Sequence, residues 1–242
     1  MSTVLMTRSI HDGEDARRFC LQNGISTLHI PLTRIEKTYI PCPLSSCYDA
    51  YIVTSAHAAP FIKELPDYVT RPIFTVGKKT SDAVHRNGAR NIITGLGSAK
   101  DMLPLIHEYL PRHSSLLHIA AADHKDEPGK TLMETGFEYN LWTAYKASEI
   151  TPVPQKLKEA LIHGQIDLAL HYSRRSAEIL KQRVIEEELL EELKKIKHIF
   201  ISHDASLAIP ELNKEQIFIA EYPDEAYLLR TCLMVHNPGD IR

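Results

Sequence analysis

Two segments of the chain follow the same pattern, an apolar run that ends at a serine and continues as a helical stretch. The first is Asp49–Ile62, DAYIVTSAHAAPFI, and the second is Asp167–Leu180, DLALHYSRRSAEIL. A shift of 118 residues (167 − 49) superimposes the two aspartates and places Ser55 on Ser173. A strand that leads into a serine and then a helix is half of a βαβ unit. The repeated pattern therefore predicts two related α/β lobes.

In each copy the serine is predicted to be the N-cap of the helix. Its hydroxyl oxygen can accept a hydrogen bond from an unpaired N–H of the first helical turn. The other amides of that turn point outward, and this arrangement binds anions. The turns at Ser55 and Ser173 are therefore candidate contacts with one ligand that both lobes face.

Extended segments without helical periodicity divide the chain. The first segment of the chain, a strand and a helix that ends at Gly24, is followed 112 residues later by a similar segment that ends at Gly136 (136 − 24). Proline-containing stretches lie near residues 37–48 and 148–155 and are typical of connections between lobes. We therefore predict a discontinuous first domain at residues 1–36 and 152–242. The second domain is inserted at residues 40–147, and the two linker crossings are residues 37–39 and 148–151.

Short strands that alternate with helices favour parallel sheets with right-handed crossovers. Ligand sites in such folds lie at the carboxyl ends of the strands. The predicted fold class is α/β, with two similar lobes that each contain a parallel sheet flanked by helices. The active site is expected in the cleft between the two domains.

The composition argues against several classes of function. The 28 basic and 31 acidic residues give a formal net charge of −3, and no run of Lys or Arg is long enough to follow a phosphate backbone, so nucleic acid is not an expected partner. The opening MSTVLMTRSIHD is interrupted by Arg8 and resembles a first strand, and no apolar run reaches membrane-spanning length. We expect a cytoplasmic protein with no membrane partner. The 4 cysteines contain no CxxC pair, which predicts reduced, packed thiols.

Common cofactor and metal motifs are absent from the sequence. It lacks GxxxxGKS, GxGxxG, HExxH and GxSxG. Gly95 and Gly97 form a Gly-x-Gly that precedes a Ser98/Asp101 capping-box pattern, which favours a loop before a helix. Three histidines lie near one another in the sequence, His113, His118 and His124, but their spacing matches no common set of metal ligands. We expect no cofactor and no metal.

Several stretches, in their order and spacing, resemble the uroporphyrinogen-III synthase family. They are the opening VLMTRS, the turn VTSAHAA, VGKKT at Val76–Thr80, the Gly136–Lys146 segment with WTAYK, and DLALHYSRRSAEIL. The resemblance covers nearly the whole chain. It implies two α/β domains joined by a two-stranded linker. It also implies a cofactor-independent lyase of haem biosynthesis that cyclises hydroxymethylbilane, a linear tetrapyrrole, to uroporphyrinogen III with inversion of ring D. We expect it to act as a monomer.

The resemblance also suggests site residues. The substrate is a polycarboxylate and the chain is net negative, so local donors must hold its carboxylates. Thr7 and Arg8 close the first strand and are expected to face the same cleft. By resemblance, Ser55, Thr80 and Ser173 are expected to bind the substrate, as is Lys125, which stands where the family often has Arg. Tyr145 is the expected catalytic residue, placed over the hydroxyl group that leaves the substrate.

Each of these residues also has a purely structural interpretation. Ser55, Thr80 and Ser173 can serve only as helix caps. Arg8 can form a surface ion pair, and Tyr145 can pack on Trp142 or the linker.

One turn of this sequence differs from the family's usual sequence. The family usually has a Gly-Pro-Thr-Thr turn in domain one, and this chain has Ser202-His203-Asp204-Ala205 there. The sequence leaves open whether Asp204, Ala205 or Ser206 replaces the missing Thr.

Two other classes of function share some of these features. A two-lobe module that binds or senses a small molecule would have the same lobes and cleft but would need no acid. A structural scaffold fits less well, because the sequence has no evident exposed apolar stripe and no repeat array. The isomer of the porphyrin formed from hydroxymethylbilane distinguishes an enzyme from a binding module, since uncatalysed closure gives isomer I.

The absence of metal and cofactor motifs leads to a first prediction. Exhaustive chelation followed by dialysis should leave the formation of uroporphyrinogen III unchanged, because the residues expected at the site hold carboxylates with amides, hydroxyls and side-chain cations. The measurement is the rate of isomer III formation before and after treatment. Loss of activity that an added metal ion restores would contradict the prediction.

Overall fold

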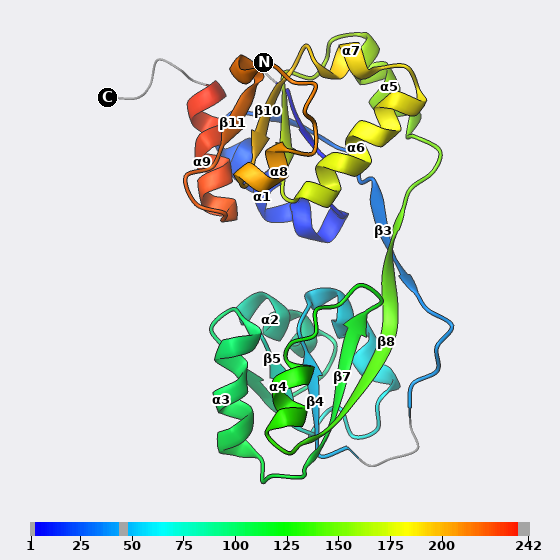
Figure 1. Ribbon diagram of the computed structural model, residues 1–242, viewed down its shortest axis with the longest axis vertical. Helices are drawn as coiled ribbons and strands as arrows, with labels where there is room; N and C mark the ends of the chain where they lie inside the picture. Colours follow the sequence, from blue (N-terminus) through cyan, green and yellow to red (C-terminus); the bar gives the residue numbers. More distant parts are fainter. Residues whose placement is uncertain (1–2, 44–47, 237–242) are drawn as a thin grey trace. The chain divides into compact units, whose positions relative to one another are not determined.

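The computed structural model describes residues 3–43 and 48–236 (Figure 1). The chain divides into two compact units, Met1–Arg34 with Ser148–Arg242, and Ile35–Ala147. The first unit is therefore discontinuous in sequence and the second is inserted into it. The boundaries fall within two strands, β3 (Thr33–Lys37) and β8 (Glu138–Glu149).

The first unit contains a 5-stranded sheet in the order β11-β10-β9-β1-β2, in which every neighbouring pair is parallel. The strands are β1 (Thr3–Met6), β2 (Ser26–His29), β9 (Leu168–His171), β10 (Lys197–Phe200) and β11 (Ile217–Ile219). Helices α1 (Ile10–Gln22) and α9 (Glu225–His236) pack on one face. The other face is covered by α5 (Gln155–Ile162), α6 (Arg174–Glu186), α7 (Leu190–Leu193) and α8 (His203–Ser206), and the 3₁₀ turn η2 (Lys214–Gln216) precedes β11.

The second unit contains a 6-stranded sheet in the order β3-β8-β7-β4-β5-β6. Its parallel core consists of β4 (Ala50–Val53), β5 (Ile73–Thr75), β6 (Ile92–Thr94), β7 (Ser115–Ala121) and β8. The 3₁₀ helix η1 (Ala56–Glu64) and α2 (Lys78–Arg86) pack on one face, and α3 (Ala99–Tyr109) and α4 (Gly129–Glu134) pack on the other. All four residues of β4 are fully buried, as a central parallel strand with helices on both faces requires.

The last strand of the second unit is longer than its sequence predicts. The pattern predicts a strand over Phe137–Thr143, whereas β8 runs from Glu138 to Glu149 and ends within the predicted linker crossing 148–151. Strand β3 lies beside β8 in the sheet, and the N–H of Thr38 donates to the C=O of Ala144 at 2.9 Å. This pairing joins segments about a hundred residues apart, so local periodicity does not reveal it.

Two further findings concern expectations from the sequence. Within residues 3–43 and 48–236, no helix is long and apolar enough to cross a membrane. Cys20, Cys42 and Cys232 are free thiols, as predicted, and Cys20 and Cys232 are fully buried, while Cys47 lies outside the described residues.

Two histidines form a fully buried pair in the sheet of the first unit. His171 in β9 and His198 in β10 are on neighbouring strands of the parallel pairing, and His171 Nε2 lies 2.9 Å from His198 Nδ1. His198 Nε2 lies 3.0 Å from the C=O of Leu193, which can only accept. His198 therefore carries its proton on Nε2, and its Nδ1 accepts from His171 Nε2–H.

Burial keeps this pair neutral. It lowers the pKa of His198 to about 4 and the pKa of His171 well below its ordinary value. In the unfolded chain a histidine titrates near pH 6.5, so the unfolded state takes up protons first as the pH falls. The stability that these histidines contribute is complete above about pH 6.5 and is lost between about pH 6.5 and pH 4, by about 2 kcal/mol for His198 alone between pH 6.5 and 5.

We expect His171→Phe to reduce the steepness of this pH dependence. With one fewer buried histidine, the slope of unfolding free energy against pH below about 6 should fall by about 1.4 kcal/mol per pH unit. At neutral pH the loss of the donor to His198 Nδ1 should cost about 1–3 kcal/mol of unfolding free energy. This cost is offset in part because the variant also removes the buried Nδ1 of His171, which has no hydrogen-bond partner in the described part of the chain. Urea denaturation across this pH range measures both effects. His163→Phe, at an exposed histidine, is the control; an identical slope in parent and His171→Phe would show that the pair does not resist protonation.

Candidate active site

Ser55 is the N-cap of η1, as the sequence predicts. It follows β4 with one residue between, its backbone is extended, and its Oγ accepts from the N–H of His57 at 3.3 Å. The helix that follows is a 3₁₀ helix and contains Pro60, which has no N–H to donate. Ser55 is half-buried, so part of its surface remains accessible at the carboxyl end of β4.

Ser173 has the equivalent position in the first unit and is also an N-cap, as predicted. Its Oγ accepts from the N–H of Ser176 at 3.1 Å, and the side chain of Ser176 accepts in return from the Ser173 N–H at 3.2 Å. This capping box opens α6 at the carboxyl end of β9. Ser173 is exposed.

The capping interpretation of Thr80 is wrong. Helix α2 begins at Lys78, its N-cap is Gly77, and Thr80 is the third helical residue and is buried. The glycine cap packs closely on another turn, since a Cβ on Gly77 would lie 3.2 Å from the Cα of Gly97. Since Gly77 has no side chain, the first amides of α2 have no hydroxyl or carboxylate cap of the kind found at Ser55.

The Gly-x-Gly segment forms the loop before α3 that its sequence predicts, and it also packs on the α2 turn. The N–H of Gly95 donates to Thr75 C=O at 2.8 Å, and the N–H of Gly97 donates to Val76 C=O at 2.6 Å. Gly97 has φ +133°, which L side chains rarely adopt. Between the glycines, Leu96 is 92% exposed. The backbone contact between these turns is a feature that sequence reasoning did not find.

Tyr145 lies in the aromatic core of the second unit. Its side chain is only 4% exposed. The ring stacks on Phe61, with centroids 5.6 Å apart and an interplanar angle of 11°, and Phe61 in turn meets Trp142 edge to face at 6.2 Å. The ring of His57 lies 6.4 Å away. Tyr145 therefore packs on Phe61, whereas its structural interpretation expected Trp142 or the linker, and Phe61 lies against Trp142 in turn.

A β-bulge determines where Tyr145 points. Ala120 pairs with Thr143, but the next residue, Ala121, pairs with Tyr145, so one extra residue is present in β8. In a regular strand Trp142 and Tyr145 would lie on opposite faces of the sheet. The bulge brings both into the same core cluster, at the carboxyl end of β7. Nothing in the local sequence indicates this shift.

Lys125 is exposed in the loop that joins β7 to α4. This loop, the Ser55 turn and the Gly77 turn all follow strands that are adjacent in one parallel sheet. The sheet therefore gathers Ser55, Thr80, Lys125 and Tyr145 toward its carboxyl edge.

In the first unit, Arg8 is held by two neighbours. Its Nη1 lies 2.7 Å from Glu225 Oε1, and its guanidinium lies 4.1 Å from the ring centroid of Tyr172. The ion pair is the structural interpretation that the sequence allowed. Thr7 is buried, and its C=O accepts from the N–H of Leu32 at 3.1 Å. Both residues follow β1, next to β9 in the sheet.

Ser202 is a candidate site residue that sequence reasoning missed. It is the N-cap of α8, and its Oγ accepts from the Ala205 N–H at 3.2 Å. The candidates for the missing Thr are otherwise engaged: Asp204 pairs with Arg174 at 3.2 Å, and the Ser206 hydroxyl donates to the C=O of His203 at 2.8 Å. The sequence did contain a signal for Ser202. Like Ser173, it stands two positions after the end of an apolar strand.

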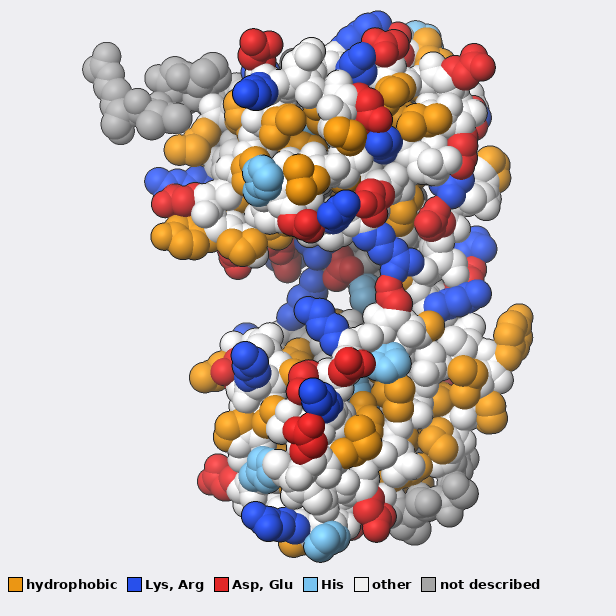
Figure 2. Space-filling view, in the orientation of Figure 1, with side chains coloured by type: hydrophobic (Ala, Val, Ile, Leu, Met, Phe, Trp, Pro, Cys, Tyr) orange, Lys and Arg blue, Asp and Glu red, His pale blue; other side chains and the backbone are white. Residues whose placement is uncertain are grey.

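The charge distribution supports recognition by local groups. On the face drawn in Figure 2, basic and acidic side chains are interspersed over both units. In the described part of the chain, no three His, Cys, Asp or Glu side chains are grouped as metal ligands. Of the histidines considered for a metal site, His118 is hydrogen-bonded to Thr54 and Tyr139.

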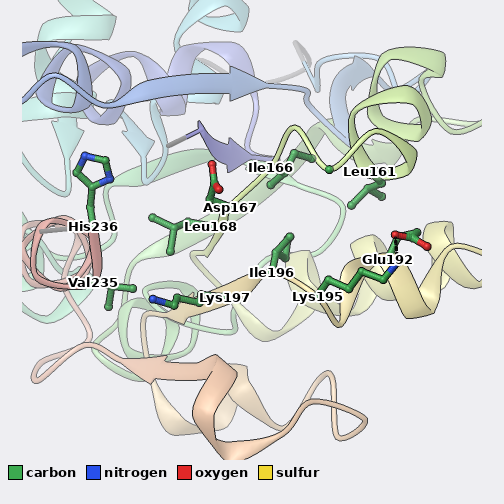
Figure 3. A pocket seen from close by; sticks show the side chains of 11 residues that line it. Leu161, Ile166, Asp167, Leu168, Glu192, Lys195, Ile196, Lys197, Val235 and His236 are labelled. Carbon is green, nitrogen blue, oxygen red and sulfur yellow. Dashed lines mark hydrogen bonds and ion pairs between the residues drawn. The ribbon is translucent and has the colours of Figure 1, made fainter. Parts of the chain in front are cut away.

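A cavity of about 480 Å³ lies at the other edge of the first unit's sheet (Figure 3). Its lining includes Leu168 and Lys197, the first residues of β9 and β10, together with Asp167 and His236. These are the amino ends of the strands, whereas Ser173 and Ser202 follow the carboxyl ends. The cavity therefore contains none of the predicted site residues.

The chain matches a known protein family over most of its length. Residues 15–230 match the family model described as uroporphyrinogen-III synthase HemD. The chain belongs to the uroporphyrinogen-III synthase family. No curated protein matches it.

Solved structures of uroporphyrinogen-III synthases have a similar fold. The enzyme from Helicobacter pylori has a TM-score of 0.60 and 14% identity, covering 97% of this chain and 99% of that one. A mutant enzyme from Thermus thermophilus has a TM-score of 0.51 and 16% identity, covering 98% of both chains. At these identities the likeness concerns the two-domain α/β fold alone.

The uroporphyrinogen-III synthase family uses a substrate with many carboxylates, so the exposed cation Lys125 is the simplest of the predicted site residues to test. We expect Lys125→Gln to raise KM for hydroxymethylbilane several-fold with little change in kcat, because a carboxylate contact present in ground and transition states alters binding alone. Arg8→Gln should act in the same way, with an added loss of stability as Glu225 loses its partner. Steady-state kinetics measure both.

Lys130→Gln, at an exposed lysine of α4, is the matched control for Lys125 and should leave both constants unchanged. A large fall in kcat at constant KM in Lys125→Gln or Arg8→Gln would instead assign that residue to the chemical step.

Proposed function

We propose that this chain converts hydroxymethylbilane to uroporphyrinogen III without a cofactor, and that its turns at the carboxyl edges of the two sheets bind the substrate. The observation that carries the proposal is the match to the uroporphyrinogen-III synthase family over residues 15–230. The helix N-termini after β4, β5, β9 and β10 support it, because they supply the donors that a polycarboxylate needs.

The reaction is a problem of positioning. Departure of hydroxide from the linear tetrapyrrole leaves an electrophilic azafulvene, and uncatalysed closure at the unsubstituted carbon of ring D gives isomer I. Isomer III requires attack by the substituted carbon of ring D, which gives a spiro intermediate that then rearranges. An enzyme that holds ring D in the second geometry selects the product, so orientation is the main source of catalysis.

Of the helices after β4, β5, β9 and β10, α2 is the one whose N-cap makes no side-chain hydrogen bond. Its N-cap is glycine, and Lys78 and Lys79 are both exposed in its first turn. The positive end of the helix dipole and these lysines favour a carboxylate. The pair between Lys78 and Asp82, at 3.2 Å, is an exposed i,i+4 pair and is worth little in water, so Lys78 can exchange that partner for the substrate.

Tyr145 is proposed to assist the departure of hydroxide. Its ring is fixed by Phe61, and its place beside Ala121 puts it at the carboxyl end of β7. A phenol held in this way donates a hydrogen bond as negative charge develops on the oxygen that leaves. Because the pyrrole nitrogen supplies the electron pair that expels hydroxide, the phenol assists a step that proceeds slowly without it.

The family match does not favour the alternative, a binding module without catalysis. The decisive experiment incubates the purified chain with freshly generated hydroxymethylbilane and separates the porphyrin isomers after oxidation. Isomer III in excess over an enzyme-free control is the expected result. Isomer I alone, at the uncatalysed rate, would contradict the proposal and support the binding module.

Nucleic acid is not proposed as a partner. The formal net charge is −3, and on the face in Figure 2 acidic side chains are interspersed with the basic ones, so this face has no continuous basic surface of the kind that follows a phosphate backbone. The proposed partner is the small-molecule tetrapyrrole alone.

Tyr145→Phe tests the role of the phenol, since it keeps the ring and removes only the oxygen. We expect kcat for isomer III to fall by roughly ten- to a thousandfold with KM nearly unchanged, within or below the usual range for a general acid. Tyr48→Phe, at a buried tyrosine in the same core that donates to Pro43 C=O, is the matched control. If Tyr145→Phe is as stable and as fast as the parent, Tyr145 is a packing residue.

A further inference from the structure

Three side chains of the second unit form a continuous chain of hydrogen bonds across its sheet. The Oγ1 of Thr54 lies 2.9 Å from His118 Nε2, and His118 Nδ1 lies 2.7 Å from the hydroxyl of Tyr139. His118 is in β7, which lies between β4 and β8, and it is 1% exposed. Thr54 is half-buried and stands between β4 and Ser55.

A neutral imidazole has one N–H donor and one acceptor nitrogen, so this chain of hydrogen bonds has a direction. His118 is neutral at working pH, because burial lowers its pKa to about 4. In one direction, Tyr139 donates to Nδ1, and Nε2–H donates to Thr54. In the other, Thr54 donates to Nε2, and Nδ1–H donates to the phenol oxygen.

The chemistry of the two hydroxyls selects the first direction. Thr54 and Tyr139 are both half-buried, and each direction leaves one hydroxyl hydrogen outside the chain of hydrogen bonds, that of Thr54 in the first and that of Tyr139 in the second. A phenol is a stronger donor and a weaker acceptor than an aliphatic hydroxyl, because it is the more acidic group. The imidazole therefore bonds best with Tyr139 as its donor and Thr54 as its acceptor.

The position of the Tyr139 ring is enforced by packing. A Cβ on Gly129, the first residue of α4, would lie 2.6 Å from two ring carbons and 2.9 Å from the hydroxyl oxygen. Helix α4 therefore lies against the ring, and a side chain at position 129 would displace it. This contact holds the phenol within reach of His118.

We propose that Tyr139 and His118 are positioning residues that turn the hydroxyl of Thr54 into a hydrogen-bond donor for a carboxylate of the linear tetrapyrrole. Thr54 accepts from His118, so its own hydrogen is available at the carboxyl end of β4, beside the Ser55 turn. In the opposite direction its hydrogen would be bound to His118, and only lone pairs would face the carboxylate. The inference rests on the proposed function for the identity of the ligand.

Kinetics of three variants test the chain of residues. Thr54→Val, which keeps the shape and removes the hydroxyl, should raise KM for hydroxymethylbilane about tenfold with kcat nearly unchanged, as for loss of one hydrogen bond to a charged group. Tyr139→Phe should raise KM by part of that factor, because His118 is then free to take either tautomer. In Thr54→Val/Tyr139→Phe, the second change should add nothing to the first.

Tyr51→Phe is the matched control, because Tyr51 is a buried tyrosine of the same sheet whose hydroxyl donates to Pro66 C=O at 2.7 Å outside this chain of residues. It should leave KM unchanged. A Thr54→Val variant with the KM of the parent, or effects of Thr54→Val and Tyr139→Phe that multiply, would overturn the proposal.

The tautomer can be observed without any activity. Long-range ¹H–¹⁵N correlation spectra of the parent should show the His118 proton on Nε2, and Tyr139→Phe should shift part of the population to Nδ1. A proton on Nδ1 in the parent would overturn the proposal even if every variant failed to fold. Formation of isomer I alone by the parent would instead contradict the proposed function, while the tautomer would still report on the hydrogen bonds.

Discussion

Parallel strand pairing is the constraint on which the rest of the structure depends. Two neighbouring parallel strands cannot be joined by a hairpin, so each connection crosses through a helix, and every strand-to-helix turn of a sheet reaches the same edge. In the first unit this places the turns at Ser173 and Ser202 side by side, because β9 and β10 are neighbours, and the pair between Arg174 and Asp204 joins them. In the second unit the Ser55 and Gly77 turns meet for the same reason, after β4 and β5.

The same constraint explains the behaviour of the buried polar groups. A strand with helices on both faces offers no water to its side chains, so a polar residue there must find its partner within the protein. His171 and His198 do so with each other and with Leu193 C=O, and His118 does so with Thr54 and Tyr139. In both cases burial keeps the imidazole neutral. A neutral imidazole relays a hydrogen bond in one direction only, so each group has a defined donor end and acceptor end.

Much of this arrangement follows from the sequence, and the limits have a physical cause. The two serine caps, the loop at Gly95–Gly97 and the Ser98 capping box are local, and local patterns predict them. The extended β8, its bulge and the contact between Gly77 and Gly97 depend on pairing between distant segments, and no local pattern reveals them. The same applies to Thr80, which is the third residue of α2 because the helix begins after a glycine N-cap that packs on Gly97. Arg8 could be assigned to either an ion pair or a ligand, and only the fold brings Glu225 to it.

The two copies of the serine turn are alike in sequence but differ in what they offer to a ligand. A capping hydroxyl uses a lone pair to accept from the helix and keeps its hydrogen. Ser55 Oγ accepts from the N–H of His57, so its own hydrogen can be donated to a ligand. Ser176 donates its own hydrogen to Ser173 C=O at 2.8 Å, which leaves its oxygen to accept from the Ser173 hydroxyl at 3.1 Å. The hydrogen of Ser173 is thus bound inside its capping box. A carboxylate that meets Ser173 must therefore bind through the helix amides and nearby arginines, whereas the second unit can add hydroxyl donors from Thr54 and Ser55.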